Sequence, residues 1–237
     1  MKRSTALAGT VGLAGTTAYL LRERIGTWVT TWGATPQEAE DVLPGDEVTP
    51  GARYIATHAV TINAPPERVW PWLAQMGQGR GGLYSYDRLE NLLGLQIHSL
   101  DHIDPALQDL SVGDTIRLVP EGTQPDLTFE VLRVEPPQLL LLGPLGPKHE
   151  AIASGLPWPT WAFVLRPVSL DGLPGGGTRL IARFRSEFAP SPVATLTNKI
   201  ALAPIHLLME RKMLLGIKER AERATAVVLE SPGGAGG

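Results

Sequence analysis

Apolar and polar residues alternate with a period of two in several stretches of the chain. This pattern is typical of strands that bury one face. Glycine and proline concentrate between these stretches, where they favour turns. We therefore expect about six strands in one sheet. They span Tyr54–Ile62, Asp114–Val119, Leu127–Val134, Leu139–Leu142, Trp161–Pro167 and Thr178–Phe188.

A period of three to four residues predicts three helices in the same region. Two short helices, Glu67–Gln75 and Ser85–Leu93, follow the first strand, and a long helix, Pro204–Leu229, closes it. The long helix has an apolar face formed by Met209, Met213, Ile217, Ala221, Ala224 and Val228. Its charged residues are assigned to the opposite face. They are Glu210, Arg211, Lys218, Glu219, Glu222 and Arg223.

The last two predicted strands each carry an apolar set that we expect to face the interior. One set is Trp161, Phe163 and Leu165, and the other is Leu180, Ala182, Phe184, Ser186 and Phe188. Arg183 and Arg185 lie on the other face of the last strand. We expect them on the convex, solvated side of the sheet. The opposite register would instead make them an anion site in the interior.

Residues 25–52 form a connector ahead of the predicted sheet. Its two tryptophans, Trp28 and Trp32, are expected to pack on the domain. Thr35 suits the N-cap and Pro36 the first position of a helix of about two turns. The chain is accordingly divided into an apolar N-terminal segment (1–24), this connector, a main domain (53–230) and a disordered tail (231–237).

The run Ala6–Leu21 contains no charged residue, and basic residues stand on both sides of it. It is shorter than the roughly 20 apolar residues of a spanning helix. We interpret it as a helix that associates with a membrane, on a side that the flanking charges leave open. Two alternatives are a secretory signal peptide and a helix packed on a cytoplasmic domain.

Composition narrows the classes of function. Lys plus Arg number 21 and Asp plus Glu number 24, so the net charge of −3 gives no indication of nucleic-acid binding. The absence of cysteine excludes disulfides, thiolate metal sites and cysteine nucleophiles. The glycine-rich stretch 77–82 lacks the lysine of a phosphate-binding loop, and Ser85 lacks the setting of a hydrolase nucleophile.

The first strand leads into its helix through Asn63-Ala64-Pro65-Pro66-Glu67. This junction resembles the opening of the START-like, or SRPBCC, helix-grip superfamily, which includes polyketide cyclases and lipid-transfer domains. The connector and the run GRGGLYSYDRLENLLG, residues 79–94, resemble an uncharacterised bacterial subgroup. The resemblance implies an α+β fold, in which a curved antiparallel sheet wraps a long C-terminal helix around a ligand cavity.

The resemblance also places one mouth of that cavity near residues 80–104. Tyrosine combines an apolar ring with one hydroxyl, which suits a largely apolar ligand. The candidate lining residues are Arg80, Tyr84, Tyr86, His98, Trp161, Phe163, Met209 and Met213. Each also has a packing role as an alternative, since tyrosines and methionines commonly fill cores.

Two chemical roles were considered for the histidines of this region. His98 could serve as a general base near neutral pH. His98 and His102, with Asp101 and Asp104, have a spacing reminiscent of metal ligands, but no third ligand stands out. We therefore expect no metal and no organic cofactor.

Three functions remain open from the sequence. The favoured one is binding or transport of a small hydrophobic molecule such as a lipid, an isoprenoid or a polyketide. The second is a polyketide cyclase or aromatase-like enzyme that uses pocket Tyr, His and Arg residues. The third is an interaction domain whose cavity has collapsed into an ordinary core.

Overall fold

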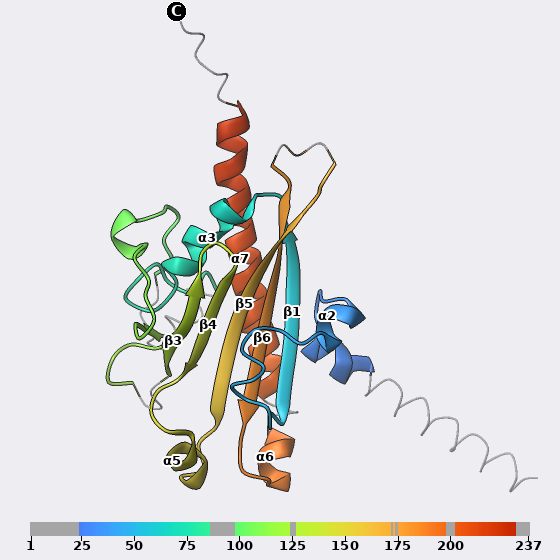
Figure 1. Ribbon diagram of the computed structural model, residues 1–237, viewed down its shortest axis with the longest axis vertical. Coiled ribbons are helices and arrows are strands. Elements are labelled where there is room, and N and C mark those ends of the chain that lie inside the picture. The colour runs from blue at the N-terminus through green and yellow to red at the C-terminus, as the bar shows by residue number, and fades with distance from the viewer. Residues whose placement is uncertain are drawn as a thin grey trace, which may run out of the picture.

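The computed structural model describes residues 24–85, 98–123, 127–171, 173, 175–197 and 202–230. An antiparallel sheet of six strands, in the order β1-β6-β5-β4-β3-β2, forms its centre. β1 and β2 are the two edges of this sheet (Figure 1). The strands are β1 (Tyr54–Ile62), β2 (Thr115–Arg117), β3 (Thr128–Glu135), β4 (Leu139–Pro144), β5 (Trp158–Val168) and β6 (Gly177–Glu187).

A long helix, α7 (Ala203–Glu230), runs along one face of the sheet beside α3 (Pro66–Ala74) (Figure 1). The helix contacts both β1 and α3. This arrangement confirms the predicted α+β class, with a six-stranded antiparallel sheet packed on the C-terminal helix. Shorter elements of the described part are α2 (Pro36–Glu40), the 3₁₀ helix η1 (Pro105–Leu107), α5 (Lys148–Ala153) and α6 (Pro192–Thr197), and residues 24–30 are helical as well.

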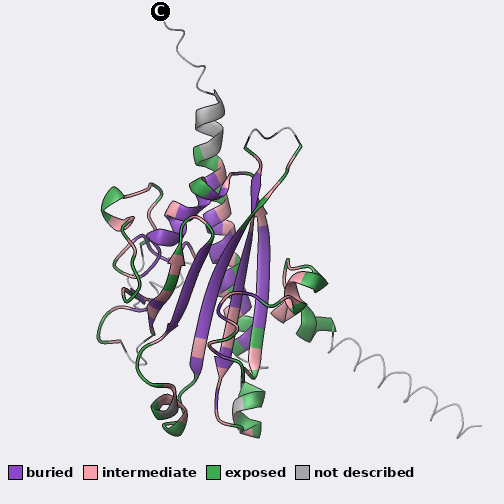
Figure 2. Cartoon of the chain, viewed as in Figure 1, coloured by how far each residue is buried: buried purple, intermediate pink, exposed green. Residues whose placement is uncertain are grey.

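The main hydrophobic core lies between the sheet and the two helices. Leu73 of α3, Phe163 of β5 and Ile217 of α7 are all fully buried in it. Figure 2 shows the buried residues concentrated along the strands and the inward side of α7. Because the inward positions of β5 and β6 match the predicted alternation, Trp161, Phe163, Leu180 and Ala182 all belong to this core, as expected.

The connector covers the other face of the sheet, where a second core cluster includes Leu43 and Ile181. The alternation correctly placed Arg183 on this face, but the expectation that it is solvated is wrong, because only 3% of it is exposed. Its guanidinium donates to Asp46 Oδ2 at 2.9 Å and to the Glu38 carbonyl at 2.7 Å. Connector carbonyls and a carboxylate therefore replace water around this cation.

The start of α2 forms as predicted from its cap. The Thr35 hydroxyl accepts from the Glu38 backbone N–H, while Glu38 accepts from the Thr35 backbone N–H, which together form a capping box. The helix is shorter than the expected two turns and spans five residues. Of the two connector tryptophans, Trp32 packs on the main core, whereas Trp28 remains 56% exposed.

Several predictions lie outside the described residues: the apolar segment before residue 24, most of the helix predicted from Ser85 to Leu93, and the tail after residue 230. The helices α5 and α6 were not predicted, because six residues are too few to establish a helical period. Within the described part, no helix has the length and hydrophobicity needed to cross a bilayer.

Candidate functional site

Glu210 of α7 is buried on the face of the helix that packs on the sheet, with only 2% of the residue exposed. The assignment of this residue to the polar face is therefore wrong. Glu210 precedes the buried residues Met213, Leu214 and Ile217 by three, four and seven positions. That spacing places its side chain on the apolar stripe, where a carboxylate requires specific partners.

The partners of Glu210 come from three elements. His58 of β1 contacts Glu210 Oε2 through Nδ1, and Trp161 of β5 donates from Nε1 to Glu210 Oε1 at 2.5 Å. His206, one turn earlier in α7, places Nε2 at 3.7 Å from Glu210 Oε1. The sheet and helix thus meet here through polar groups within an otherwise apolar core.

The outer atoms of both histidines also have partners. His58 Nε2 lies 2.9 Å from the carbonyl oxygen of Val29, near the start of the connector. The Tyr54 hydroxyl lies 3.3 Å from His206 Nδ1. We refer to Tyr54, His58, Trp161, His206 and Glu210 as the Glu210 cluster.

Aromatic rings surround this cluster on the side where α7 begins. The Phe184 ring lies 4.6 Å from that of His206 and 6.1 Å from that of Tyr54, between ring centroids. Tyr54, Phe184 and His206 are half-buried, whereas His58 and Glu210 are fully buried. The three half-buried rings therefore form the more exposed side of this region, and the His58–Glu210 pair forms its buried side.

Electrostatics favour a charged pair at the centre of the cluster. Burial lowers the pKa of His58, but the hydrogen bond and charge of Glu210 outweigh burial and leave this pKa raised. Burial raises the pKa of Glu210, but the neighbouring histidines and the Trp161 N–H outweigh burial and leave it lowered. Burial lowers the pKa of His206. The metal-free cluster thus holds an imidazolium, a carboxylate and a neutral imidazole.

Three of the predicted site residues lie at or beside this cluster. Trp161 belongs to it, and the Phe163 ring packs 4.8 Å from the Trp161 ring. Met213 is buried on the same face of α7 as Glu210. Met209 is half-buried, and its carbonyl accepts a hydrogen bond from the Ser85 hydroxyl at 3.4 Å.

The candidates from the region of residues 80–98 have other roles in the structure. Tyr84 is buried edge-to-face against Trp72, and the Arg220 guanidinium lies 4.9 Å from the centre of its ring. Burial raises the pKa of Tyr84 to about 12, so its hydroxyl is neutral at physiological pH. Arg80 donates to two backbone carbonyls and thereby joins neighbouring loops.

His98 is exposed and lies outside the Glu210 cluster, while Tyr86 falls outside the described residues. His102, whose spacing from His98 is reminiscent of metal ligands, is also exposed. Its Nδ1 lies 3.3 Å from Asp101 Oδ1. His98 and His102 are therefore both exposed side chains, apart from the Glu210 cluster.

Sequence reasoning missed four of the five cluster residues: Tyr54, His58, His206 and Glu210. A signal was present in the first strand. Tyr54 and His58 share the inward alternation with Ala56, Val60 and Ile62, so a histidine stands where an apolar residue is expected. A polar residue at a position that alternation buries requires a hydrogen-bond partner. Glu210 is the equivalent polar residue on the buried face of α7.

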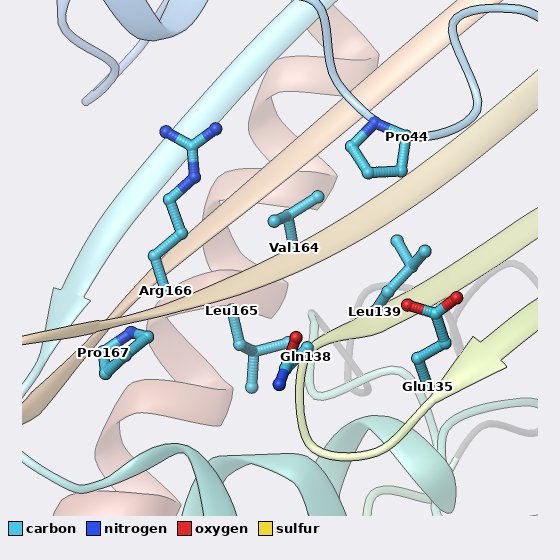
Figure 3. Close-up of a pocket in the computed structure, with 8 residues that line it drawn as sticks. All are labelled: Pro44, Glu135, Gln138, Leu139, Val164, Leu165, Arg166 and Pro167. Carbon is cyan, nitrogen blue, oxygen red and sulfur yellow. The ribbon is translucent and has the colours of Figure 1, made fainter.

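A separate hollow of about 390 Å³ lies between the connector and the turn that joins β3 to β4. Figure 3 shows apolar side chains of this hollow together with two opposite charges, Glu135 and Arg166. Leu139 and Val164, which line it, belong to the core cluster under the connector. The hollow is therefore on the opposite side of the sheet from the Glu210 cluster.

No family model matches the sequence, and no curated protein matches it either. Its structural neighbours are helix-grip proteins. They include a Mesorhizobium loti protein, with 20% identity over 72% of this chain and 98% of that one and a TM-score of 0.39. The Zhui aromatase/cyclase of a Streptomyces species has 14% identity over 73% of this chain and 95% of its own, with a TM-score of 0.41. Norcoclaurine synthase from Thalictrum flavum has 15% identity over 75% of this chain and 87% of its own, with a TM-score of 0.40. These likenesses concern the fold alone, so function has to be argued from the residues.

Proposed function

We propose that this protein binds a small, mostly hydrophobic molecule between its sheet and α7, with a polar group of the ligand held at the Glu210 cluster. Lipids, isoprenoids and polyketides all combine an apolar body with such a group. The observation that carries the proposal is a buried carboxylate, with histidines and a tryptophan around it, on the helix that the sheet packs against.

The cost of this arrangement supports a role beyond packing. Burying a carboxylate and an imidazole requires complete hydrogen bonding, and an apolar core of the same shape would be at least as stable. The cluster nevertheless leaves His206 Nε2 inaccessible to solvent and without a hydrogen-bond partner among the described residues. Clusters of this kind, with strongly perturbed pKa values, are concentrated at functional sites.

The side chains around the cluster suit an apolar ligand with one polar end. Phe184 and Tyr54 offer half-buried ring faces at the opening, and Trp161 and Phe163 continue the aromatic surface inward. Such a surface supplies most of the binding free energy by excluding water, while Glu210 and His58 fix the orientation.

Replacing the Glu210 carboxylate with an amide tests this proposal. The substitution Glu210→Gln keeps the shape but removes the charge, which contributes about 1.5–3 kcal/mol to a hydrogen bond. We expect the full chain, isolated from its native host, to carry a small molecule detectable by native mass spectrometry and organic extraction. The Gln variant should carry at least about tenfold less of it.

The matched control is Glu219→Gln, because Glu219 lies on the exposed face of the same helix and pairs with Arg223. This variant should retain the molecule at the wild-type level. Equal loading of all three proteins would show that Glu210 does not hold the ligand. A folded wild-type protein without any bound molecule would remove the support for binding altogether.

A second candidate, an enzyme of the cyclase or aromatase kind, is favoured by the His58–Glu210 pair. An imidazolium beside a carboxylate can donate a proton to a carbonyl oxygen and take it back. Incubation of an extracted ligand with the wild type would then produce a second species of different mass or absorbance, and Glu210→Gln would not. An unchanged ligand leaves binding as the function.

Membrane association is also proposed, from the apolar segment Ala6–Leu21 and from the surface around the start of α7. Large exposed apolar side chains gather on α6 and in the first turns of α7, which share one end of the molecule (Figure 1). They are Val193, Leu196, Leu202, Ile205 and Leu208. A lipid surface at this end would deliver an apolar ligand to the opening of the Glu210 cluster.

Sedimentation with phosphatidylethanolamine and phosphatidylglycerol vesicles tests this association in the full chain. We expect Leu196→Asp to reduce the bound fraction, because a charge would enter the lipid-facing surface. Val112→Asp is the control, since Val112 is 64% exposed outside this group. An equal effect of both substitutions would refute a membrane-facing role for α6.

A further inference from the structure

We infer that His58, His206 and Glu210 form a binding site for a divalent transition metal of the Zn²⁺ class. This departs from the sequence-based expectation of no metal and goes beyond the proposed ligand binding, since the metal can be tested alone. One donor atom from each of the three residues lies within 4.8 Å of the other two. Two imidazoles and one carboxylate are a common ligand set for zinc sites that keep an open position.

The donor atoms are close enough together to surround one ion after local rearrangement of the side chains. An ion central to three donors that are 4.8 Å apart or closer lies within about 2.8 Å of each, whereas Zn²⁺ bonds to nitrogen and oxygen are about 2.0–2.2 Å. His206 Nε2 and Glu210 Oε1 are 3.7 Å apart, close to the separation of two ligands on one tetrahedral ion. His58 Nδ1 is in direct contact with Glu210 Oε2, so binding of an ion would also require these two atoms to move apart.

The outer atoms of all three residues are held in the manner of metal ligands. Bound histidines donate their remaining N–H to a carbonyl or another acceptor, and bound carboxylates accept additional hydrogen bonds. His58 Nε2 reaches the Val29 carbonyl, and His206 Nδ1 reaches the Tyr54 hydroxyl. Glu210 Oε1 accepts from the Trp161 N–H. His58 and His206 each keep their second nitrogen for the ion, and Glu210 Oε1 can bind it through the lone pair that Trp161 leaves unused.

The contact between His58 and Glu210 itself calls for a cation. The Val29 carbonyl accepts from His58 Nε2, so that nitrogen carries a hydrogen. His58 Nδ1 then meets a carboxylate oxygen, and two lone pairs can face each other only with a positive charge between them. A proton on Nδ1 satisfies this contact, and a metal ion would have to displace that proton in order to bind.

His206 is the most exposed of the three proposed ligands, and its substitution gives the clearest test of the metal site. About 19% of its side chain is exposed, while its Nε2 is buried and without a partner among the described residues. Replacing this ring removes a ligand without breaking a hydrogen bond of Nε2 to the described residues. His206→Leu removes the hydrogen bond between Nδ1 and Tyr54 and the ring contact with Phe184, but it keeps an apolar side chain against the aromatic rings, so the fold should tolerate it.

The experiment measures Zn²⁺ content by elemental analysis and Co²⁺ absorption spectra after dialysis of the full chain. We expect one ion per wild-type chain, visible d–d bands with Co²⁺, and an increase in melting temperature with Zn²⁺. His206→Leu and Glu210→Gln should lose all three signals. Tyr54→Phe should weaken binding about tenfold, because only the second contact of His206 is removed.

His102→Ala is the matched control, because His102 is exposed and pairs with Asp101 away from the cluster. It should retain the ion completely. Melting in the presence of EDTA verifies that each variant is folded. No Zn²⁺ in the wild type, or the same content in His206→Leu, would overturn the inference, and neither result would affect binding of a hydrophobic molecule.

Discussion

A carboxylate between a helix and a sheet is costly unless its oxygens are hydrogen-bonded, and Glu210 meets this condition with partners from β1 and β5. The apolar stripe of α7 and the inward phase of β1 were both readable from the sequence. The pairing of Glu210 with His58 was not, since these residues are separated by 152 positions and nothing local specifies that they meet.

Glu38 illustrates a second ion pair, and its pKa leads to a prediction of pH dependence. The hydrogen bond from Arg179 lowers this pKa from 4.5 to about 2, against an opposing effect of burial. A group with a depressed folded-state pKa stabilises above its unfolded pKa and loses that contribution as the pH falls through the folded value. The contribution of Glu38 should therefore be complete above about pH 4.5 and decline toward pH 2.

Urea unfolding at pH 7, 4.5 and 3 measures this effect. The wild type should lose more stability than Glu38→Gln over this range, because the variant has no carboxylate to protonate. Glu121→Gln is the control, since the Glu121 side chain is 83% exposed. Parallel loss of stability in the wild type and in Glu38→Gln would contradict the strong pairing with Arg179.

At the scale of elements, alternation predicted the strands well because each buries one face. The predicted Tyr54–Ile62 coincides with β1, and the remaining strands differ mainly at their ends. The candidate site was predicted less completely. Trp161, Phe163 and Met213 were identified from apolar spacing, whereas polar residues such as His206 gave no periodic signal.

The close approach of α7 to the segment around Tyr84, which follows α3, depends on Gly216. A Cβ at this position would lie 2.3 Å from the Tyr84 carbonyl oxygen. Gly216→Ala should therefore destabilise the protein by about 1–3 kcal/mol, as overpacking does. Alanine is otherwise preferred over glycine in helices by about 1 kcal/mol. The sign of the change in unfolding free energy therefore distinguishes a close contact at Gly216 from an open helix surface.

Thermal or urea unfolding of Gly216→Ala provides the measurement. The matched control is Gly26→Ala, which lies in an exposed helical segment with no atom within 4 Å of the added Cβ. That variant should be neutral or slightly stabilised. A stabilised Gly216→Ala protein would show that α7 does not pack as closely as described.

At the scale of the whole molecule, the sheet is enclosed on both sides, by α7 on one and by the connector on the other. Arg183 fastens the connector, since its guanidinium donates to acceptors in residues 38–46: the carbonyls of Glu38, Ala39 and Asp41, and Asp46 Oδ2. The sequence predicted that the connector tryptophans pack on the domain, but it could not indicate the contacts of Arg183, because their acceptors are mostly backbone carbonyls.

Arg183→Met should release the connector while leaving the sheet folded. We expect faster hydrogen exchange in residues 33–49 and unchanged exchange in β5. Arg166→Met is the control, because Arg166 reaches Asp41 only at 3.5 Å with 44% of its side chain exposed. Unchanged exchange in the connector of Arg183→Met would show that Arg183 does not fasten it.

The central claim is that the space between the sheet and α7 receives a small molecule at the Glu210 cluster. A crystal structure of the full chain, isolated from its native host, tests this most directly. The account expects electron density for a non-protein molecule against Trp161 and Phe184, with a polar atom directed to Glu210 or His58. Protein side chains that fill this space completely, with no such density, would contradict it.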